Sequence, residues 1–239
     1  MSNDLRSIVD RVSHAITQRG QARRLQRSLT VTPRDDLVKI GSSYGAWPIP
    51  VDTLSSDSVC YLAGLGEDAS FDLGLIERVG CTVHVFDPVP EAARYAETIG
   101  AHEPRFDFQP IGLWSSDRVL RFYDNAEPGF VSRSATNMHG TGTYFEAQVR
   151  SIGSLMREWG HRRIDLLKLS VEGSEYEILG NILAERIPVG VLCVEFAQPS
   201  PLGPIRHQVQ ALTGAGYQLN DVWLRPFNWR LTFSSSSID

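Results

Sequence analysis

The amino-acid sequence predicts one α/β domain, a mostly parallel sheet with helices on both faces. Three observations lead to this fold class. From residue 58 onward, short apolar runs alternate with amphipathic runs of helical length. Several short runs, such as 189–197, are apolar almost throughout, as strands covered on both faces are. Glycine or proline stands at many boundaries between runs. Such alternation implies a parallel sheet with right-handed crossovers.

The N-terminal region has a different pattern. Apolar residues recur there at helical intervals among charged residues, which predicts a helical extension over residues 1–37 that acts as a lid or a dimer contact. The stretch GSSYGAWPIP at 41–50 is expected to be irregular because it is rich in glycine and proline. Tyr44 and Trp47 lie in this stretch, and such large aromatic side chains must cover either the core or a ligand.

The first half of the domain contains three predicted strands and two predicted helices. The strands are expected at 58–64, at 81–87 and around 105–114, and the helices at 69–80 and 89–100. The second helix has a proline near its start and Gly100 after its end, which is the arrangement that helix termini prefer.

The second half interrupts the alternation and then resumes it. Short strands are expected within 117–150, where Asn, Gly and Pro separate β-like runs. Helices are then expected at 151–160, 174–186 and 205–216, and strands at 164–170, at 189–197 and twice within 217–233. We expect the main domain to extend over 38–233 and residues 234–239 to form a disordered tail.

Composition argues against several classes of function. The chain has a net charge of -5 and a pI near 5.7, which disfavours a nucleic-acid partner because phosphate binding needs clustered Lys and Arg. Cys60, Cys81 and Cys193 lie in apolar runs without metal-ligand spacing. We find neither a run that could span a bilayer nor the apolar stretch of a signal peptide. We therefore expect a cytoplasmic protein with no membrane partner.

A glycine-containing turn follows the first strand of the alternating region. Gly64 and Gly66 allow a tight turn and a close approach of the backbone to a ligand. Asp87 ends the next strand 21 positions after Gly66, where an acid could hold a ribose diol. The third glycine of the dinucleotide fingerprint is missing, since Ala69 and Ser70 stand there. The pattern indicates an adenosine-containing cofactor, and an ordinary tight turn is the structural alternative.

Two acids in this turn separate the possible cofactors. Glu67 and Asp68 would repel a pyrophosphate, whereas they suit the cationic amino-acid end of S-adenosylmethionine. The sequence therefore favours a methyltransferase over a nicotinamide-dependent oxidoreductase of the same architecture.

The stretch IDLLKLSVEGSEYEIL at 164–179 changes abruptly from apolar to acidic. Ser170 and Glu172 are expected at the carboxyl end of this strand, beside the glycine turn. Lys168 is a charge inside an otherwise buried strand and needs a partner there. Glu195 lies similarly at the end of its own strand, so both strand ends could face one cleft.

A purely structural interpretation accounts for part of the same stretch. In this interpretation the stretch ends in an exposed helix N-terminus, where Ser174 could cap the helix and Glu175 and Glu177 would interact favourably with the helix dipole. This interpretation explains the two glutamates better than it explains Lys168.

Several of these stretches together resemble a known family. The sequences GSSYGAW (41–47), LAGLGEDASFDLGLIERVGCTVHVFDPVP (62–90), IGLWS (111–115), IDLLKLSVEGSEYEIL (164–179) and VLCVEF (191–196) are similar to the FkbM-type S-adenosylmethionine-dependent methyltransferases. The resemblance extends over roughly residues 38–225. It implies the class I methyltransferase fold, a Rossmann-like seven-stranded sheet with one antiparallel strand.

The resemblance also implies a set of cofactor-binding residues. By this likeness Gly64, Gly66, Glu67 and Asp68 would line the methionine moiety, Asp87 would hold the ribose, and 111–113 would lie near the adenine. The complete expected set comprises Tyr44, Gly64, Leu65, Gly66, Glu67, Asp68, Ser70, Phe71, Asp87, Pro88, Ile111, Gly112 and Leu113.

The activity that the resemblance implies is O-methylation of a sugar or natural product, a small hydroxylated acceptor. Glu172 or Glu195 would be the general base, with Lys168 and Ser170 beside them and His139 in reserve. No metal is expected, and a homodimer is possible.

The chain departs from the family at two positions. The family usually has Asp in place of Ser170. A subgroup of the family, in which GSSYGAW also has a counterpart, usually has His in place of Ala197. The alternative function is therefore a pseudo-enzyme, or a repurposed fold, that still binds S-adenosylmethionine.

Overall fold

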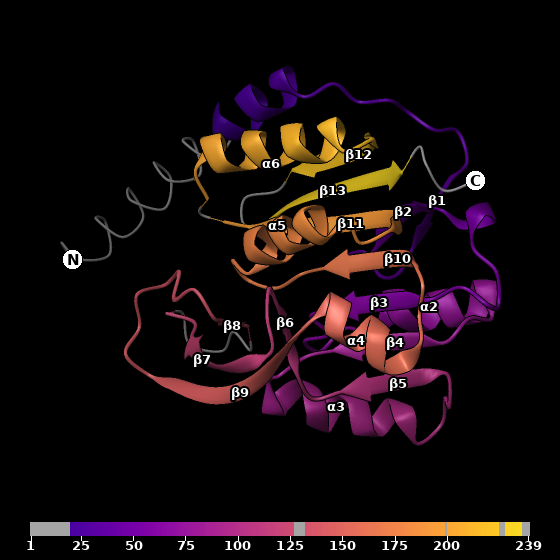
Figure 1. Ribbon diagram of the computed structural model, residues 1–239, viewed down its shortest axis with the longest axis vertical. Coiled ribbons are helices and arrows are strands. Elements are labelled where there is room, and N and C mark those ends of the chain that lie inside the picture. Colours follow the sequence, from indigo (N-terminus) through magenta and orange to yellow (C-terminus); the bar gives the residue numbers. More distant parts are fainter. Residues whose placement is uncertain (1–19, 127–131, 199, 225–227, 236–239) are drawn as a thin grey trace, which may run out of the picture.

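The central feature of the computed structural model is a seven-stranded sheet (Figure 1). The structure describes residues 20–126, 132–198, 200–224 and 228–235. In sheet order, the strands are β12 (Tyr217–Leu224), β13 (Asn228–Ser235), β11 (Val189–Ala197), β10 (Ile164–Leu169), β3 (Cys60–Ala63), β4 (Val83–Phe86) and β5 (Phe106–Gln109). Strand β13 is antiparallel to both neighbours, and the other pairings are parallel. This is the class I methyltransferase order, as expected.

The helices cover the two faces of this sheet in separate groups. Helices α4 (Ile152–Trp159), α5 (Glu175–Glu185) and α6 (Leu202–Gly214) contribute to one buried apolar cluster, and α2 (Ser70–Val79) and α3 (Pro90–Gly100) contribute to the other. Successive strand residues alternate between the clusters: Leu167 belongs to the first and Leu166 to the second. This alternation is why strand β10 is buried along its whole length.

The predicted N-terminal extension is described only in part. Residues 20–28 form a helical segment that lies beside α6 (Figure 1), and Leu25 is fully buried. Arg206 on α6 fixes the segment through hydrogen bonds to Ser28 Oγ and the Arg24 carbonyl oxygen, at 3.0 and 3.2 Å. The predicted helix before residue 20 and the tail at 236–239 lie outside the described residues.

The stretch 41–50 is more regular than its composition suggests. Strand β2 (Trp47–Pro50) pairs with β1 (Leu37–Ile40) in a two-stranded antiparallel sheet, so the expectation of an irregular segment is wrong for 47–50. Trp47 packs into the core of the second cluster, whereas Tyr44 is 68 % exposed. Trp47 therefore covers part of the core, whereas the Tyr44 side chain does not.

The interruption at 117–150 forms a second sheet next to the main one. It contains β6 (Gly112–Trp114), β9 (Tyr144–Ser151), β7 (Arg118–Asp124) and β8 (Arg133–Ser134) in this order. The strand expected around 105–114 is two strands in two different sheets, because Pro110 lacks an N–H and ends the ladder of β5. The expectation of short strands here is confirmed.

Most other element boundaries lie within two residues of their predicted positions, with a few exceptions. Helix α6 begins three residues before the predicted start, and β13 extends to Ser235 and so includes two residues that we placed in the tail. Gly80 ends α2 as expected, because it adopts the left-handed conformation (φ 80°) that glycine tolerates best.

Candidate functional site

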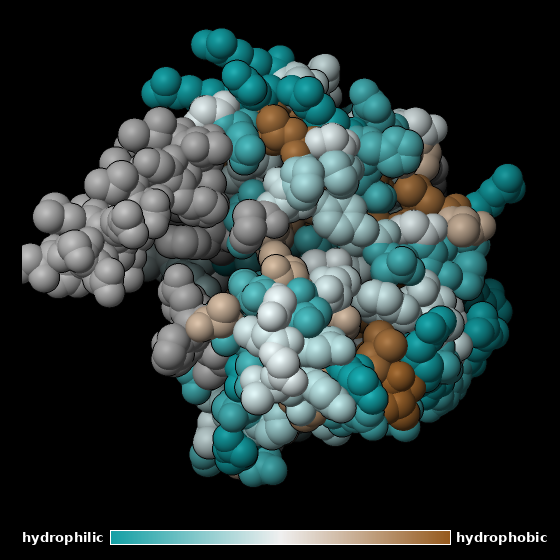
Figure 2. Space-filling view, turned by 90° about the vertical axis from the view of Figure 1, so that its left-hand side faces the viewer, coloured by the Kyte–Doolittle hydropathy of each residue, from teal (hydrophilic) through white to brown (hydrophobic). Residues whose placement is uncertain are grey.

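The loops after β3 and β10 meet at the carboxyl edge of the sheet. Strand β3 lies between β4 and β10, so the order of strands reverses there and a crevice is expected beyond the strand ends. Figure 2 looks onto this edge, where the described residues form a mainly hydrophilic face. Gly64 has φ 85°, and a Cβ added there would lie 1.9 Å from the Ser170 carbonyl oxygen. Only glycine allows this close approach.

Asp87 fixes the shape of the glycine turn. Its Oδ2 accepts hydrogen bonds from Leu65 N and Gly66 N, at 2.9 and 3.0 Å, and its Oδ1 accepts one from Val89 N at 2.9 Å. Burial raises the pKa of Asp87, although these bonds oppose the shift. The structure thus gives Asp87 a role in holding the turn, and its predicted contact with a ribose remains a prediction.

Asp68 joins the turn to the segment after β1. Its carboxylate accepts hydrogen bonds from Ser42 Oγ (2.7 Å) and Ser70 N (2.9 Å), while Ser42 N donates to Ser70 Oγ (2.7 Å). Burial alone would raise the pKa of Asp68, but its hydrogen bonds to Ser70 and Ser42 lower it overall. Asp68 is therefore ionised at neutral pH, as recognition of a cationic methionine group requires.

Lys168 lies beneath the same turn. Only 6 % of this residue is exposed, and its Nζ donates a 2.9 Å hydrogen bond to the Gly64 carbonyl oxygen. Its positive charge contributes to the lowered pKa of Asp68 and opposes the raised pKa values of Asp72 and Asp87. The hydrogen-bond partner of this buried charge is thus a main-chain oxygen, and three acids lie near enough to interact with it electrostatically.

Asp72 is a buried acid that the sequence analysis missed. It is fully buried on α2, and neither carboxylate oxygen has a hydrogen-bond partner among the described residues. Burial raises its pKa, and Lys168 opposes the rise. The missed signal was its spacing, because Asp72 precedes the buried Leu75 and Ile76 by three and four positions.

Arg230 is the second residue that the sequence analysis missed. It lies opposite Glu195 in the pairing of β11 with β13, and its Nε donates to Glu195 Oε2 at 2.5 Å. Its Nη1 donates to the carbonyl oxygens of Tyr44 (2.6 Å) and Ala46 (3.4 Å). Glu195, which we considered as a general base, is therefore engaged in a buried ion pair.

Three aromatic rings surround this guanidinium. The Arg230 Cζ lies 5.0 Å from the ring centroid of Trp223, 5.1 Å from that of Trp47 and 5.8 Å from that of Tyr44. These distances lie within the range of cation–π attraction. Of the three rings, Tyr44 is the exposed one.

Glu172 has the properties that a general base needs. Its backbone adopts a left-handed conformation (φ 46°), and its carbonyl oxygen accepts a 2.8 Å hydrogen bond from Ser134 Oγ. Burial raises the pKa of Glu172 to about 7, and the charge of Glu195 adds to the rise. Within the described part of the chain, its half-buried carboxylate makes no hydrogen bond or ion pair, so it is available to a ligand.

Glu175 is not the exposed helix-terminal acid that we expected. It is fully buried, its Oε2 accepts a 2.7 Å hydrogen bond from Gly173 N, and its Oε1 has no partner among the described residues. Burial raises its pKa to about 7. The expected cap is also wrong, since the Ser174 side chain makes no capping hydrogen bond; Glu177 is exposed as expected.

The loop that contains His139 packs against the loop of Glu172. Met138 N donates to Ser134 Oγ at 3.4 Å, and a Cβ added at Gly173 would lie 3.7 Å from Met138 Sδ. His139 itself is half-buried. The structure therefore brings this reserve base to the same corner of the molecule.

The remaining expected cofactor residues fall into two groups. Leu65, Phe71 and Leu113 are buried in the apolar clusters and so belong to the core that underlies the site. Glu67 is exposed, while Pro88 and Ile111 are half-buried. A Cβ added at Gly112 would lie 3.6 Å from Pro88 Cγ, so the predicted adenine segment does lie beside the end of β4. Gly66 has open space beside it, which leaves room for a ligand.

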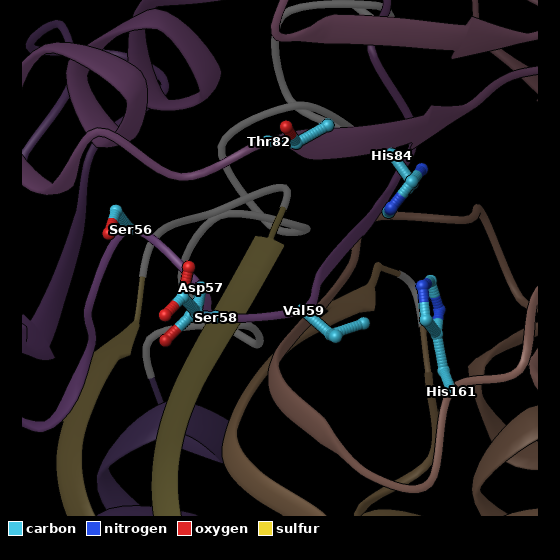
Figure 3. A pocket seen from close by; sticks show the side chains of 7 residues that line it. All are labelled: Ser56, Asp57, Ser58, Val59, Thr82, His84 and His161. Carbon is cyan, nitrogen blue, oxygen red and sulfur yellow. The ribbon is translucent and has the colours of Figure 1, made fainter.

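A cavity of about 280 Å³ lies at the opposite, amino edge of the sheet (Figure 3). It is lined by Ser56, Asp57, Ser58, Val59, Thr82, His84 and His161. The two imidazole centroids are 5.3 Å apart, and both rings make hydrogen bonds: His84 Nδ1 with Asp107 Oδ2 and His161 Nδ1 with Tyr61 Oη. This cavity lies across the sheet from Glu172 and is separate from the candidate site.

The described residues contain neither a metal-binding cluster nor a membrane-spanning helix. Among them, no group of three or more His, Cys, Asp or Glu side chains is arranged to hold a metal ion. Within the same residues, no helix has the length and apolarity needed to cross a membrane.

Comparison with known proteins also indicates a methyltransferase. The family described as the methyltransferase FkbM domain matches residues 65–219. Probable methyltransferase-like protein 24 of Homo sapiens is 27% identical over 128 residues, which cover 53% of this chain and 28% of that protein. The protein of the same name from Rattus norvegicus gives 27% identity over 53% of this chain and 29% of its own. The chain thus spans under a third of these curated relatives.

Solved structures show a more distant likeness. The fibrillarin pre-rRNA processing protein of Methanococcus jannaschii has a TM-score of 0.45 at 14% identity, covering 80% of this chain and 70% of its own. Precorrin-6y C5,15-methyltransferase of Geobacter metallireducens has a TM-score of 0.42 at 12% identity, covering 77% and 86%.

Proposed function

We propose that this chain, which belongs to the FkbM methyltransferase domain family, methylates a hydroxyl group of a small sugar or natural-product acceptor. Its family identifies it as an S-adenosylmethionine-dependent methyltransferase, and the fold agrees. The observation that carries the proposal for the acceptor is Glu172, a carboxylate free of protein partners among the described residues, with a pKa of about 7. Because the family is one of methyltransferases, we set aside the alternative of a nicotinamide-dependent oxidoreductase.

The residues at the glycine turn fit the cofactor. Gly66 has open space beside it, Asp68 is ionised, and the exposed Glu67 adds a second negative charge. Asp87 holds the turn through its hydrogen bonds to the main chain. The close packing at Gly64 leaves no room for a side chain there. A cationic amino-acid group would be attracted to this turn, whereas a pyrophosphate would be repelled.

In the proposed mechanism, Glu172 accepts the proton of the acceptor hydroxyl. S-adenosylmethionine, which the glycine turn with Asp68 would hold, would supply an electrophilic methyl group for the acceptor oxygen and would leave as S-adenosylhomocysteine. A base with a pKa near 7 is well matched to this proton transfer at neutral pH, and general base catalysis contributes about 100- to 10,000-fold. His139, half-buried beside the same loop, is the reserve base.

The surroundings of Glu172 also suit a hydroxylated acceptor. The exposed ring of Tyr44 provides a flat apolar surface on which a sugar ring can stack. Carboxylate oxygens nearby accept hydrogen bonds from hydroxyl groups. Burial raises the pKa of the Tyr44 hydroxyl, and the charges of Glu195, Glu172 and Asp68 add to the rise, so these acids lie near the ring.

The test is transfer of labelled methyl from S-adenosylmethionine to a panel of sugars and hydroxylated natural products. We expect Glu172→Gln to reduce kcat about 100-fold or more while S-adenosylhomocysteine still binds. Glu177→Gln is the matched control, because Glu177 is an exposed acid on α5. Full activity of Glu172→Gln would remove this residue from the mechanism.

The two departures from the family define the competing function. Ala197 is buried and apolar at the end of β11, and Ser170 supplies no carboxylate at the end of β10. A pseudo-enzyme would bind S-adenosylhomocysteine in calorimetry yet transfer no methyl group to any acceptor in the panel. Turnover by the unmodified protein, with no further gain from Ser170→Asp, would exclude it.

A further inference from the structure

Arg230 links three parts of the site that are far apart in sequence. We propose that Arg230 is a positioning residue, which holds segment 42–47 against the site and engages Glu195, so that Glu172 remains the carboxylate available to the acceptor. This inference rests on the proposed function and adds to it a residue that does not itself touch the reacting atoms.

The first link is the ion pair with Glu195. The two residues are direct neighbours in the antiparallel pairing of β11 with β13, and their side chains are 9 % and 7 % exposed. Removing two charges from water is costly unless they meet in good geometry. A 2.5 Å contact provides such geometry, and it occupies the Glu195 oxygen nearest to Arg230.

The second link is to the backbone of segment 42–47. The same guanidinium donates to the carbonyl oxygens of Tyr44 and Ala46 and lies over the rings of Tyr44, Trp47 and Trp223. A planar fork of donors can satisfy the carboxylate and the main chain simultaneously, whereas a lysine ammonium on a flexible stem cannot reproduce this arrangement.

The third link runs from the same segment to the predicted cofactor turn. Ser42 Oγ donates to Asp68 Oδ2, and Ser42 N donates to Ser70 Oγ. Segment 42–47 is therefore fixed at one end to the turn after β3 and at the other end to β13. If Arg230 no longer held Tyr44 and Ala46, Ser42 at the start of the segment would be less restrained. Asp68, which is hydrogen-bonded to Ser42, would then be less restrained as well.

Arg230 also affects the electrostatic surroundings of Glu172 through its pairing with Glu195. Glu195 from β11 and Glu175 from α5 are acids near Glu172, Tyr44 brings its hydroxyl from segment 42–47, and His139 comes from the loop packed on Gly173. The positive charge of Arg230 offsets the negative charge of Glu195. Without it, the negative charge of Glu195 would oppose ionisation of Glu172 more strongly.

The test titrates the Glu172 carboxyl by ¹³C NMR, with the signal assigned through Glu172→Gln, and needs no turnover. We expect Arg230→Met to move the Glu172 midpoint upward and Glu195→Gln to move it downward, each on the order of one pH unit. The charge-balanced Arg230→Met/Glu195→Gln double variant is expected to return it close to the unmodified value. Methyl-transfer pH profiles should move in parallel.

Arg230→Lys tests the positioning role separately, since it keeps the charge. We expect roughly tenfold weaker binding of S-adenosylhomocysteine in calorimetry, comparable to the loss of one charge-assisted hydrogen bond. Arg121→Lys, at an exposed ion pair on β7, is the control and should bind normally.

Two results would overturn the inference. These are an unchanged Glu172 midpoint in a folded Arg230→Met protein, and unchanged cofactor affinity in Arg230→Lys. The NMR and calorimetric results support or overturn the role of Arg230 even if no acceptor is methylated, so failure of the proposed function would be recognised separately.

Discussion

Lys168 Nζ donates a hydrogen bond to the Gly64 carbonyl oxygen, 2.9 Å away, and joins the end of β10 to the turn after β3. The ammonium is almost completely buried, and its charge acts on Asp72, a buried acid with no hydrogen-bond partner among the described residues. One lysine thus shapes the turn and compensates for a buried acid. Removal of the lysine would therefore leave a buried carbonyl oxygen without its donor and a buried acid without a nearby positive charge, and both changes are destabilising.

We predict that Lys168→Met lowers the free energy of unfolding by about 1 to 3 kcal/mol, the range for leaving a buried polar group without its hydrogen-bond partner. The mutation leaves Asp72 without its nearby positive charge and the Gly64 carbonyl without its donor. Denaturant unfolding and the melting temperature measure the loss.

The chain has one other lysine, Lys39, which is exposed, and Lys39→Met should change stability little. Adding Asp72→Asn to Lys168→Met should recover part of the loss, because the buried carboxylate is then replaced by a neutral amide. If Asp72→Asn brought no recovery, the two residues would not be energetically coupled.

Gly64 and Gly66 form a matched pair for a test of the glycine turn. Both have positive φ, but a Cβ at Gly64 would collide with the Ser170 carbonyl oxygen, whereas a Cβ at Gly66 meets nothing within 4 Å. We predict that Gly66→Ala costs only the backbone strain, about 1 to 2 kcal/mol. Gly64→Ala should cost clearly more, because the loops after β3 and β10 must separate. Equal melting temperatures for the two variants would contradict this reading of the turn.

The sheet was predictable because its strands are apolar on both faces and end at recognisable turns. Strand β11 has the predicted bounds, and α2 ends at Gly80 as its sequence indicates. The pairing of β1 with β2 could not be foreseen, since proline and glycine normally argue against a strand and this short pairing tolerates them.

Two signals predicted parts of the candidate site: the glycine turn between a strand and a helix, and a charge that interrupts an apolar strand. The second signal identified Lys168, and the same signal would have identified Arg230, which stands between apolar residues in a buried strand. Glu175 was misjudged because its position at a helix start suggested exposure. Its spacing to Ile178 and Leu179, three and four residues later, already indicated the buried face of α5.

We predict that Glu175 makes stability fall as the pH rises. Burial raises its pKa in the folded protein from the ordinary value of 4.5 to about 7. The folded state therefore binds more protons than the unfolded state between these two values, and ionisation above them penalises folding. The full penalty is about 3 kcal/mol. Glu175→Gln should remove it, so that the variant loses less stability than the unmodified protein from pH 4.5 to above pH 7.

Glu177→Gln is the control for this measurement, because Glu177 lies in the same first turn of α5 but is exposed. Its unfolding free energy should follow the pH dependence of the unmodified protein. A Glu175→Gln protein with that same dependence would mean that the buried carboxyl is already protonated, or is better compensated, across the whole range.

His161 in the amino-edge cavity is expected to contribute the opposite pH dependence. Burial lowers the pKa of His161 below its ordinary value of 6.5, and the nearby His84 lowers it further. The unfolded state therefore binds more protons just below pH 6.5, and stability falls as the pH falls through this value. His161→Gln should weaken the dependence of the melting temperature on pH between about 7 and about 5. The exposed His102→Gln should leave it unchanged, and equal slopes in all three proteins would show that His161 is readily protonated in the folded state.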